Sequence, residues 1–245
     1  MSLLERFKKK RTQVGLDIGS RSIKLVEILI EGTSVSLTAV GVKELQPGVV
    51  ENGEIKDRDA FIEEVTTLVD QCDPSIVDVV ISLGGQGILS DKLIFKVEPN
   101  ENIADTILWE ASQRSPFDAE GITISYKVLR EFPEKNEVEV LLVAAKNEIM
   151  QTYIDALYDA GLRTTAVDVD TFAFNNCYAR ESYSEAALST LVLLDIGFNA
   201  CRVTFIKDGM FHSSREINTA TSFFASTIEK QLKVPAPDAL SLLHG

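Results

Sequence analysis

A short sequence pattern occurs twice in this chain, once near the start and once near the end. The first copy runs Val14-Gly-Leu-Asp-Ile-Gly-Ser-Arg-Ser-Ile-Lys-Leu-Val-Glu-Ile28, and the second runs Leu193-Leu-Asp-Ile-Gly-Phe-Asn-Ala-Cys-Arg-Val-Thr-Phe-Ile206. In each copy an apolar run ends in Asp-Ile-Gly, small or polar residues follow, and an alternating strand resumes. Two apolar strands joined by a short turn with glycine are typical of a β-hairpin. The chain is therefore predicted to contain two similar hairpins.

The turn of each hairpin is predicted to bind phosphate. Gly19 and Gly197 have no Cβ, so we expect the backbone to approach a ligand closely and to adopt positive φ. Successive N–H groups in such a turn form an anion-binding nest, and the hydroxyls of Ser20 and Ser22 add donors. Two purely structural turns are the alternative interpretation, and the repetition of the motif favours phosphate binding.

The two aspartates of the motif predict a metal ion at the same site. Asp17 and Asp195 cannot face bare phosphate, because like charges repel each other. They fit a Mg²⁺ ion held between them through water, since Mg²⁺ keeps much of its hydration shell. Two hairpins that face each other across a cleft are how the actin-like fold holds the phosphates of ATP, so nucleotide binding is the first hypothesis.

Composition restricts the other classes of function. The chain has 245 residues, 45% of them hydrophobic and 25% charged, which is typical of a folded protein of one or two domains. The formal net charge of -13 argues against a nucleic-acid surface, which needs a basic stripe. The three cysteines lie far apart without metal-ligand spacing, which favours reduced thiols in a cytoplasm. No apolar run approaches the ~18 residues of a membrane span.

Hydrophobic periodicity predicts an α/β protein organised in five parts. Alternating strands, a helical stripe over 59–72 and a buried strand over 77–83 favour a first core, and a βαββα order follows it. Helices are also expected from Asp170, with an Asp-Thr cap, and from an Asn218 cap to Leu232. The predicted parts are a flexible basic N-terminus over 1–12, a first core over 13–90, an inserted βαββα subdomain over 91–162, a return to the first core with a connecting helix over 163–189, and the start of a second core over 190–245.

Several segments resemble the PilM family, the actin-like ATPases of type IV pilus assembly. The opening motif from Val14 to Glu27 is similar to the start of that family, although it does not separate PilM from the cell-division protein FtsA. The segments that favour PilM are Leu141-Leu-Val-Ala-Ala-Lys-Asn147, Ala160-Gly-Leu162, Val167-Asp-Val-Asp-Thr-Phe-Ala173 and Leu193-Leu-Asp-Ile-Gly197. The resemblance implies an actin-like fold, a duplicated ribonuclease H-like core with an inserted subdomain.

The resemblance also implies which residues bind the ligand. Asp17, Gly19 and Ser20 would form the first phosphate loop, with Ser22 and Lys24 beside it. Asp195, Gly197 and Asn199 would form the second phosphate loop, and Asp170 would lie near the metal. ATP and Mg²⁺ are the cofactors that this arrangement implies.

The resemblance implies partners and a location as well. A PilM-like chain would sit at the cytoplasmic face of the inner membrane, peripheral to it. It would bind the N-terminal cytoplasmic peptide of PilN, in a groove between the first core and the insertion, and contact other pilus inner-membrane components. Self-association is a further expectation.

The family's chains continue past the point where this sequence stops, through a further subdomain and a Gly-rich segment that binds adenosine. The second core is therefore expected to be truncated in this sequence, and the affinity for ATP is expected to be reduced.

Two alternatives stay open at this stage. One is an FtsA-like cell-division scaffold, and the other is a sugar or acid kinase with Asp168 or Asp170 as the base. Catalytic turnover is also open: a weak ATPase is one reading, and a scaffold regulated by the nucleotide is the other. The two histidines, His212 and His244, do not build a catalytic triad or a metal site at sensible spacing.

Overall fold

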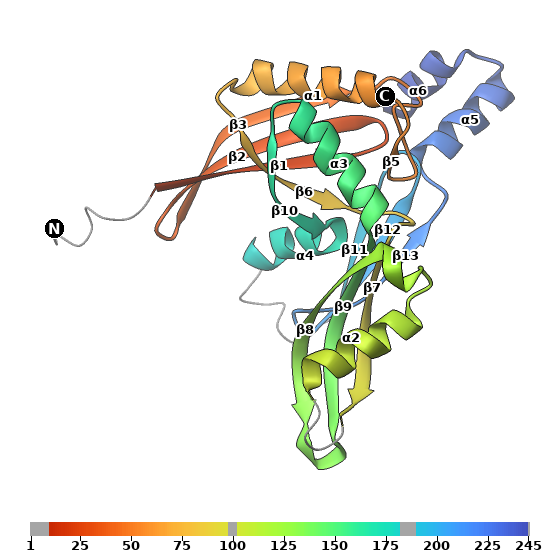
Figure 1. The fold of residues 1–245 in the computed structure, drawn as a ribbon. Helices are drawn as coiled ribbons and strands as arrows, with labels where there is room; N and C mark the ends of the chain where they lie inside the picture. The colour runs from red at the N-terminus through yellow and green to blue at the C-terminus, as the bar shows by residue number, and fades with distance from the viewer. Residues whose placement is uncertain (1–9, 98–101, 182–189, 245) are drawn as a thin grey trace. The chain divides into compact units, whose positions relative to one another are not determined.

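The computed structural model describes residues 10–97, 102–181 and 190–244, and Figure 1 traces them. Most of the basic N-terminus predicted over 1–12 lies outside these residues. The described chain divides into two compact units. Unit 1 holds residues 10–83 and 151–170, and unit 2 holds 84–97, 102–150, 171–181 and 190–244.

A five-stranded sheet forms the centre of unit 1, in the order β10-β6-β1-β2-β3. Its strands β1, β2 and β3 form an antiparallel meander, and β6 pairs in parallel with both β1 and β10. A two-stranded ribbon of β4 and β5 lies outside this sheet. The strands of unit 1 are β1 (Lys10–Ile18), β2 (Ser22–Glu31), β3 (Ser34–Glu44), β4 (Val50–Glu51), β5 (Glu54–Ile55), β6 (Asp78–Leu83) and β10 (Arg163–Val169).

Helix α1 (Arg58–Cys72) packs against this sheet because its sequence has one apolar stripe. Asp57 caps its start by accepting a hydrogen bond from the Ala60 N–H at 3.1 Å. The buried residues of the stripe are Phe61, Val65, Leu68 and Val69. The side chains of Leu68 and Cys72 lie over Gly41 of β3, where a Cβ atom would collide with both.

A glycine cap follows helix α3 (Asn147–Asp159). Gly161 has a φ of 82° and donates its N–H to the carbonyl of Tyr158 at 2.9 Å. Tyr153 of α3 is buried and meets Phe61 edge to face, with ring centroids 6.1 Å apart. Burial raises the pKa of the Tyr153 hydroxyl well above its ordinary value, and the charge of Glu54 adds to this effect.

Unit 2 contains two three-stranded sheets. The first has the order β7-β9-β8 and packs on α2 through Phe95, Ile107, Val138 and Val140. Its elements are β7 (Ile88–Lys96), α2 (Ile103–Arg114), a 3-10 turn (Ala119–Gly121), β8 (Ile122–Phe132), a second 3-10 turn (Pro133–Lys135) and β9 (Glu137–Lys146). The βαββα order predicted for 91–162 is present in the chain, and residues of α3 from Gln151 onward cluster with unit 1.

The second sheet of unit 2 has the order β11-β12-β13 and is antiparallel throughout. Asp208 and Gly209, both with positive φ, form the turn between β12 and β13, as an Asp-Gly hairpin requires. The remaining elements are α4 (Asp170–Glu181), β11 (Thr190–Ile196), β12 (Cys201–Lys207), β13 (Met210–Ile217), α5 (Thr221–Leu232) and α6 (Ala236–His244).

Two element boundaries differ from the sequence-based prediction. Strand β7 begins at Ile88, before the boundary at 91 that was predicted for the inserted subdomain, because it pairs with β9 along its whole length. Helix α5 begins at Thr221 with Ala220 as its N-cap, so the predicted Asn218 cap is wrong. Among the described helices, none is long and apolar enough to cross a membrane.

Candidate functional site

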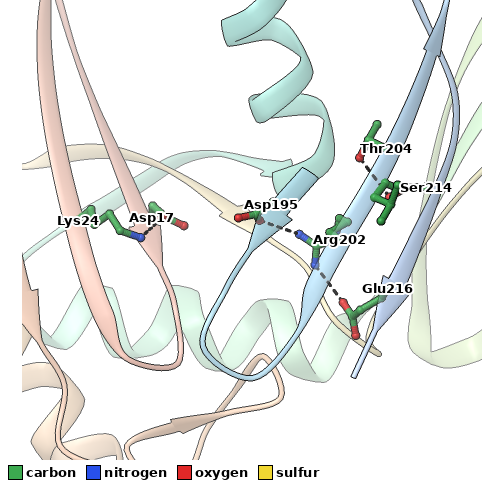
Figure 2. Close-up of polar contacts among 8 residues, drawn as sticks. Asp17, Lys24, Asp195, Arg202, Thr204, Ser214 and Glu216 are labelled. Carbon is green, nitrogen blue, oxygen red and sulfur yellow. Dashed lines mark hydrogen bonds and ion pairs between the residues drawn. The ribbon is translucent and has the colours of Figure 1, made fainter. Parts of the chain in front are cut away.

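The first Asp-Ile-Gly motif forms the β1–β2 hairpin in unit 1. Asp17 lies opposite Lys24 in the strand register, and the lysine Nζ donates to the aspartate Oδ2 at 2.7 Å (Figure 2). Gly19 begins the turn and donates its N–H to the Ser22 carbonyl at 3.0 Å. Ser20 lies within the turn, and Ser22 opens β2. The structure thus places all five predicted residues of this copy on one hairpin.

The second motif forms the β11–β12 hairpin in unit 2 with the same internal spacing. Asp195 lies opposite Arg202, and Gly197 donates its N–H to the Ala200 carbonyl at 3.0 Å. Asn199 lies within the turn. In both copies the aspartate is followed by the glycine two residues later, by the residue with the accepting carbonyl five residues later, and by the basic residue seven residues later. The two hairpins are therefore built alike, as the repeated pattern predicted.

The reason for glycine in these turns differs from the one expected. Neither Gly19 nor Gly197 is among the residues with positive φ, so the prediction of left-handed glycines is wrong. Instead, a Cβ atom at Gly197 would come within 2.8 Å of the Ala200 carbonyl oxygen, and one at Gly19 within 3.2 Å of the Ser22 oxygen. The close approach of the chain to itself therefore disfavours a larger residue at Gly197 and, less strongly, at Gly19.

The glycine N–H groups are already used inside the turns. Since each donates to the carbonyl across its own hairpin, a phosphate would have to be bound by groups that follow the glycine in the turn. The turn residues are half-buried, so their polar groups remain partly open to solvent.

The aspartates of the two hairpins have different electrostatic surroundings. Asp17 and Lys24 form an ion pair in which both side chains are about half exposed. Asp195 is similarly exposed, but its basic partner Arg202 has a side chain that is only 16% exposed. The Arg202 guanidinium donates to Glu216 Oε2 at 3.0 Å and approaches Asp195 Oδ2 at 3.9 Å (Figure 2).

A helix start supports the turn of the second hairpin. The Gly197 carbonyl accepts two hydrogen bonds from Thr221, one from the backbone N–H at 3.2 Å and one from the hydroxyl at 3.0 Å. The Phe198 carbonyl accepts from the Ser222 N–H at 2.9 Å. The first N–H groups of α5, which have no partner within the helix, are thereby satisfied by the turn.

The remaining predicted residues lie near the boundary of β10 and α4. Asp168 accepts a hydrogen bond from the N–H of Val169 at 2.8 Å, and Asp170 is the first residue of α4. In the part of the chain that the structure describes, no three His, Cys, Asp or Glu side chains are grouped closely enough to hold a metal ion by themselves. The assignment of Asp17, Asp195 and Asp170 to a metal site stays a prediction.

Sequence reasoning missed Arg202 and Glu216. The signal for Arg202 was present, because it occupies the same place in the second motif as Lys24 does in the first. Glu216 had no comparable signal, since only the pairing of β12 with β13 brings it opposite Arg202.

Solved structures with the same architecture are known. A chain of a PilM–PilN type IV pilus biogenesis complex superimposes with a TM-score of 0.81 at 23% identity, over 94% of this chain and 68% of that chain. The ethanolamine utilization protein EutJ from Carboxydothermus hydrogenoformans matches with a TM-score of 0.50 at 14% identity, over 94% of this chain and 60% of that chain. The fold is actin-like, as predicted.

The family comparison agrees with the fold comparison and with the sequence resemblance. The family model of the type IV pilus assembly protein PilM matches residues 15–239, a range that includes both hairpins, so this chain belongs to the PilM family.

Proposed function

We propose that this chain is an ATP-binding scaffold of type IV pilus assembly, which uses the nucleotide as a conformational ligand. The observation that carries the proposal is the pair of Asp-Ile-Gly hairpins with identical spacing and identical turn hydrogen bonds, one in each unit. Membership of the PilM family supports a role in type IV pilus assembly. The chain spans 68% of the PilM–PilN complex chain that it matches, so the activity of a whole PilM protein is part of the proposal.

Each hairpin would supply groups that bind the phosphates of Mg-ATP. Gly19 and Gly197 keep the turns narrow, and the polar groups of Ser20, Ser22 and Asn199 would donate to phosphate oxygens. Lys24 would balance part of the phosphate charge. Asp17 and Asp195 would hold a hydrated Mg²⁺ through water, and the ion would supply positive charge to offset that of the phosphates. Hydrolysis needs a positioned water and a base, and we assign no residue of this chain to that role.

The proposed protein partner is the N-terminal cytoplasmic peptide of a PilN-type inner-membrane protein. Support comes from the similarity to a chain of a PilM–PilN complex. Binding such a peptide would hold this chain at the cytoplasmic face of the inner membrane.

The test is a pair of calorimetric titrations of this chain, one with Mg-ATP and one with a synthetic PilN N-terminal peptide. We expect both to bind, and we expect Asp195→Asn to weaken Mg-ATP without changing peptide affinity. The matched control is Asp208→Asn, which removes the same charge from the far turn of the β12–β13 hairpin. A scrambled peptide controls for composition.

Each titration can fail separately. If folded chain binds the peptide but not Mg-ATP, the nucleotide half of the proposal is wrong. If it binds Mg-ATP but not the peptide, the partner half of the proposal is wrong.

A further inference from the structure

A row of alternating charge crosses the second sheet of unit 2. Asp195 of β11 lies opposite Arg202 of β12, which in turn lies opposite Glu216 of β13. The three side chains project from the same face of the sheet, since register partners share a face. One guanidinium is therefore placed between two carboxylates, as Figure 2 shows.

The contacts that the Arg202 guanidinium makes with the two carboxylates are unequal. The contact with Glu216 is a hydrogen bond of 3.0 Å, and both side chains are largely shielded, at 16% and 28% exposure. The contact with Asp195 is longer, at 3.9 Å, and the aspartate is 56% exposed. Glu216 thus fixes the orientation of Arg202, whereas Asp195 lies beyond hydrogen-bond distance from it.

The chemistry of arginine suits a second anionic partner at this place. A guanidinium has five N–H donors in a planar fork, so one edge can keep Glu216 while another binds phosphate oxygens. Charge-assisted hydrogen bonds of this kind are among the stronger ones in proteins. Lys24, at the equivalent place in the first hairpin, has a single ammonium and one aspartate partner.

We propose that Arg202 is a phosphate-binding residue of the second hairpin, and that Glu216 is the residue that positions it. A phosphate would bind the donors that face Asp195, which lie 3.9 Å from its carboxylate, and that carboxylate would stay available to hold a hydrated Mg²⁺ through water. The inference rests on the proposed function and extends it, because it assigns a basic residue to each hairpin.

The first test compares Arg202→Gln with Arg215→Gln in calorimetric titrations with Mg-ATP. Arg215 is an exposed neighbour on β13 that lies opposite Val203, so its side chain projects from the other face of the sheet. Both substitutions change the net charge equally. We expect Arg202→Gln to weaken binding by about ten- to a hundred-fold and Arg215→Gln by less than about three-fold.

The second test asks whether Glu216→Gln raises or lowers the affinity for Mg-ATP. Removing a carboxylate near an anion strengthens anion binding if only the overall charge matters. If Glu216 orients Arg202, the affinity for Mg-ATP falls instead, while the melting temperature of the free chain and the affinity for the PilN peptide stay near those of the original chain. Arg202→Lys keeps the charge and is expected to bind Mg-ATP at an intermediate level, which provides a folded variant should Arg202→Gln not fold.

The outcomes separate the inference from the proposed function. If the original chain binds Mg-ATP and both Arg202 variants match Arg215→Gln, the inference is overturned and nucleotide binding stands. A rise in affinity with Glu216→Gln overturns the positioning role. If the original chain does not bind Mg-ATP at all, the inference and the nucleotide half of the proposed function fall together.

Discussion

The carbonyl oxygen of Ala200 lies 3.0 Å from the backbone nitrogen of Gly197 and would lie 2.8 Å from a Cβ atom at that glycine. The equivalent distance at Gly19, to the Ser22 oxygen, is 3.2 Å. The second hairpin is therefore the tighter of the two, and the two glycines should differ in their tolerance of a methyl group.

The first prediction concerns these glycines. Gly197→Ala is expected to lower the free energy of unfolding by about 1–3 kcal/mol, because backbone atoms must shift to relieve the contact. Gly19→Ala should cost less. Urea unfolding provides the measurement, and Gly121→Ala provides the control, since a Cβ atom there meets nothing within 4 Å. Equal stability of Gly197→Ala and Gly121→Ala would show that the turn can widen freely.

The second prediction concerns the dependence of ATP binding on Mg²⁺. Asp195→Asn removes a charge that repels phosphate and attracts the cation. Binding of ATP in the presence of a chelator should therefore strengthen, and the gain in affinity on adding Mg²⁺ should fall at least about five-fold. Titrations with and without Mg²⁺ measure both quantities. An unchanged Mg²⁺ effect would remove Asp195 from the proposed metal site.

The third prediction concerns the contact between α1 and α3 in unit 1. Phe61 and Tyr153 are both buried and meet edge to face at 6.1 Å. Phe61→Ala should lower the free energy of unfolding by about 3–5 kcal/mol, through lost burial and the cavity that remains. A double-mutant cycle with Tyr153→Leu should give a coupling energy of about 0.5–1.5 kcal/mol. Strict additivity of the two substitutions would argue against a direct ring contact.

The fourth prediction concerns pH. Arg163 of β10 donates two hydrogen bonds to Asp78 of β6, at 2.6 and 2.8 Å, and this hydrogen bonding holds the pKa of the Asp78 carboxyl below its ordinary value. A lowered folded-state pKa stabilises the fold above the unfolded-state pKa of about 3.9, and this stabilisation is lost as the pH falls through the folded-state value.

Asp78→Asn should therefore lower the urea midpoint at pH 7, and its difference from the original chain should shrink as the pH falls below about 4. Asp91→Asn is the control, because the carboxyl of Asp91 accepts a hydrogen bond from the adjacent Lys92 N–H and forms no ion pair between strands within the residues that the structure describes. A difference at pH 7 that persists unchanged into acid would contradict the assignment of the effect to the charged form of Asp78.

Much of the fold follows from local signals. Alternation along Ile23 and Leu25 predicts their burial, and the apolar stripe through Phe61 and Leu68 predicts which face of α1 packs. The Asp-Gly pair at 208 and 209 fixes the turn between β12 and β13. These signals depend only on residues close in sequence, so they can be recognised without a structure.

Other features depend on contacts between distant segments. The start of α5 at Thr221 is set by the Gly197 carbonyl, which no pattern around Asn218 could reveal. Glu216 becomes part of the candidate site only through strand pairing with Arg202. The need for glycine at position 197 was predicted, but its cause was not, because a backbone approach of this kind arises only once the hairpin has formed.

The hydrogen bonds between the start of α5 and the second hairpin turn couple the position of the helix to the shape of the turn. Its first two residues are fastened to the carbonyls of Gly197 and Phe198, so the turn cannot change shape without pulling on the helix or breaking these bonds. The side chains of Phe223 and Phe224, which follow directly after Thr221 and Ser222 in the first turn of α5, are about half exposed. A change in the shape of this turn would therefore move the start of α5 and the two half-exposed aromatic side chains that it carries.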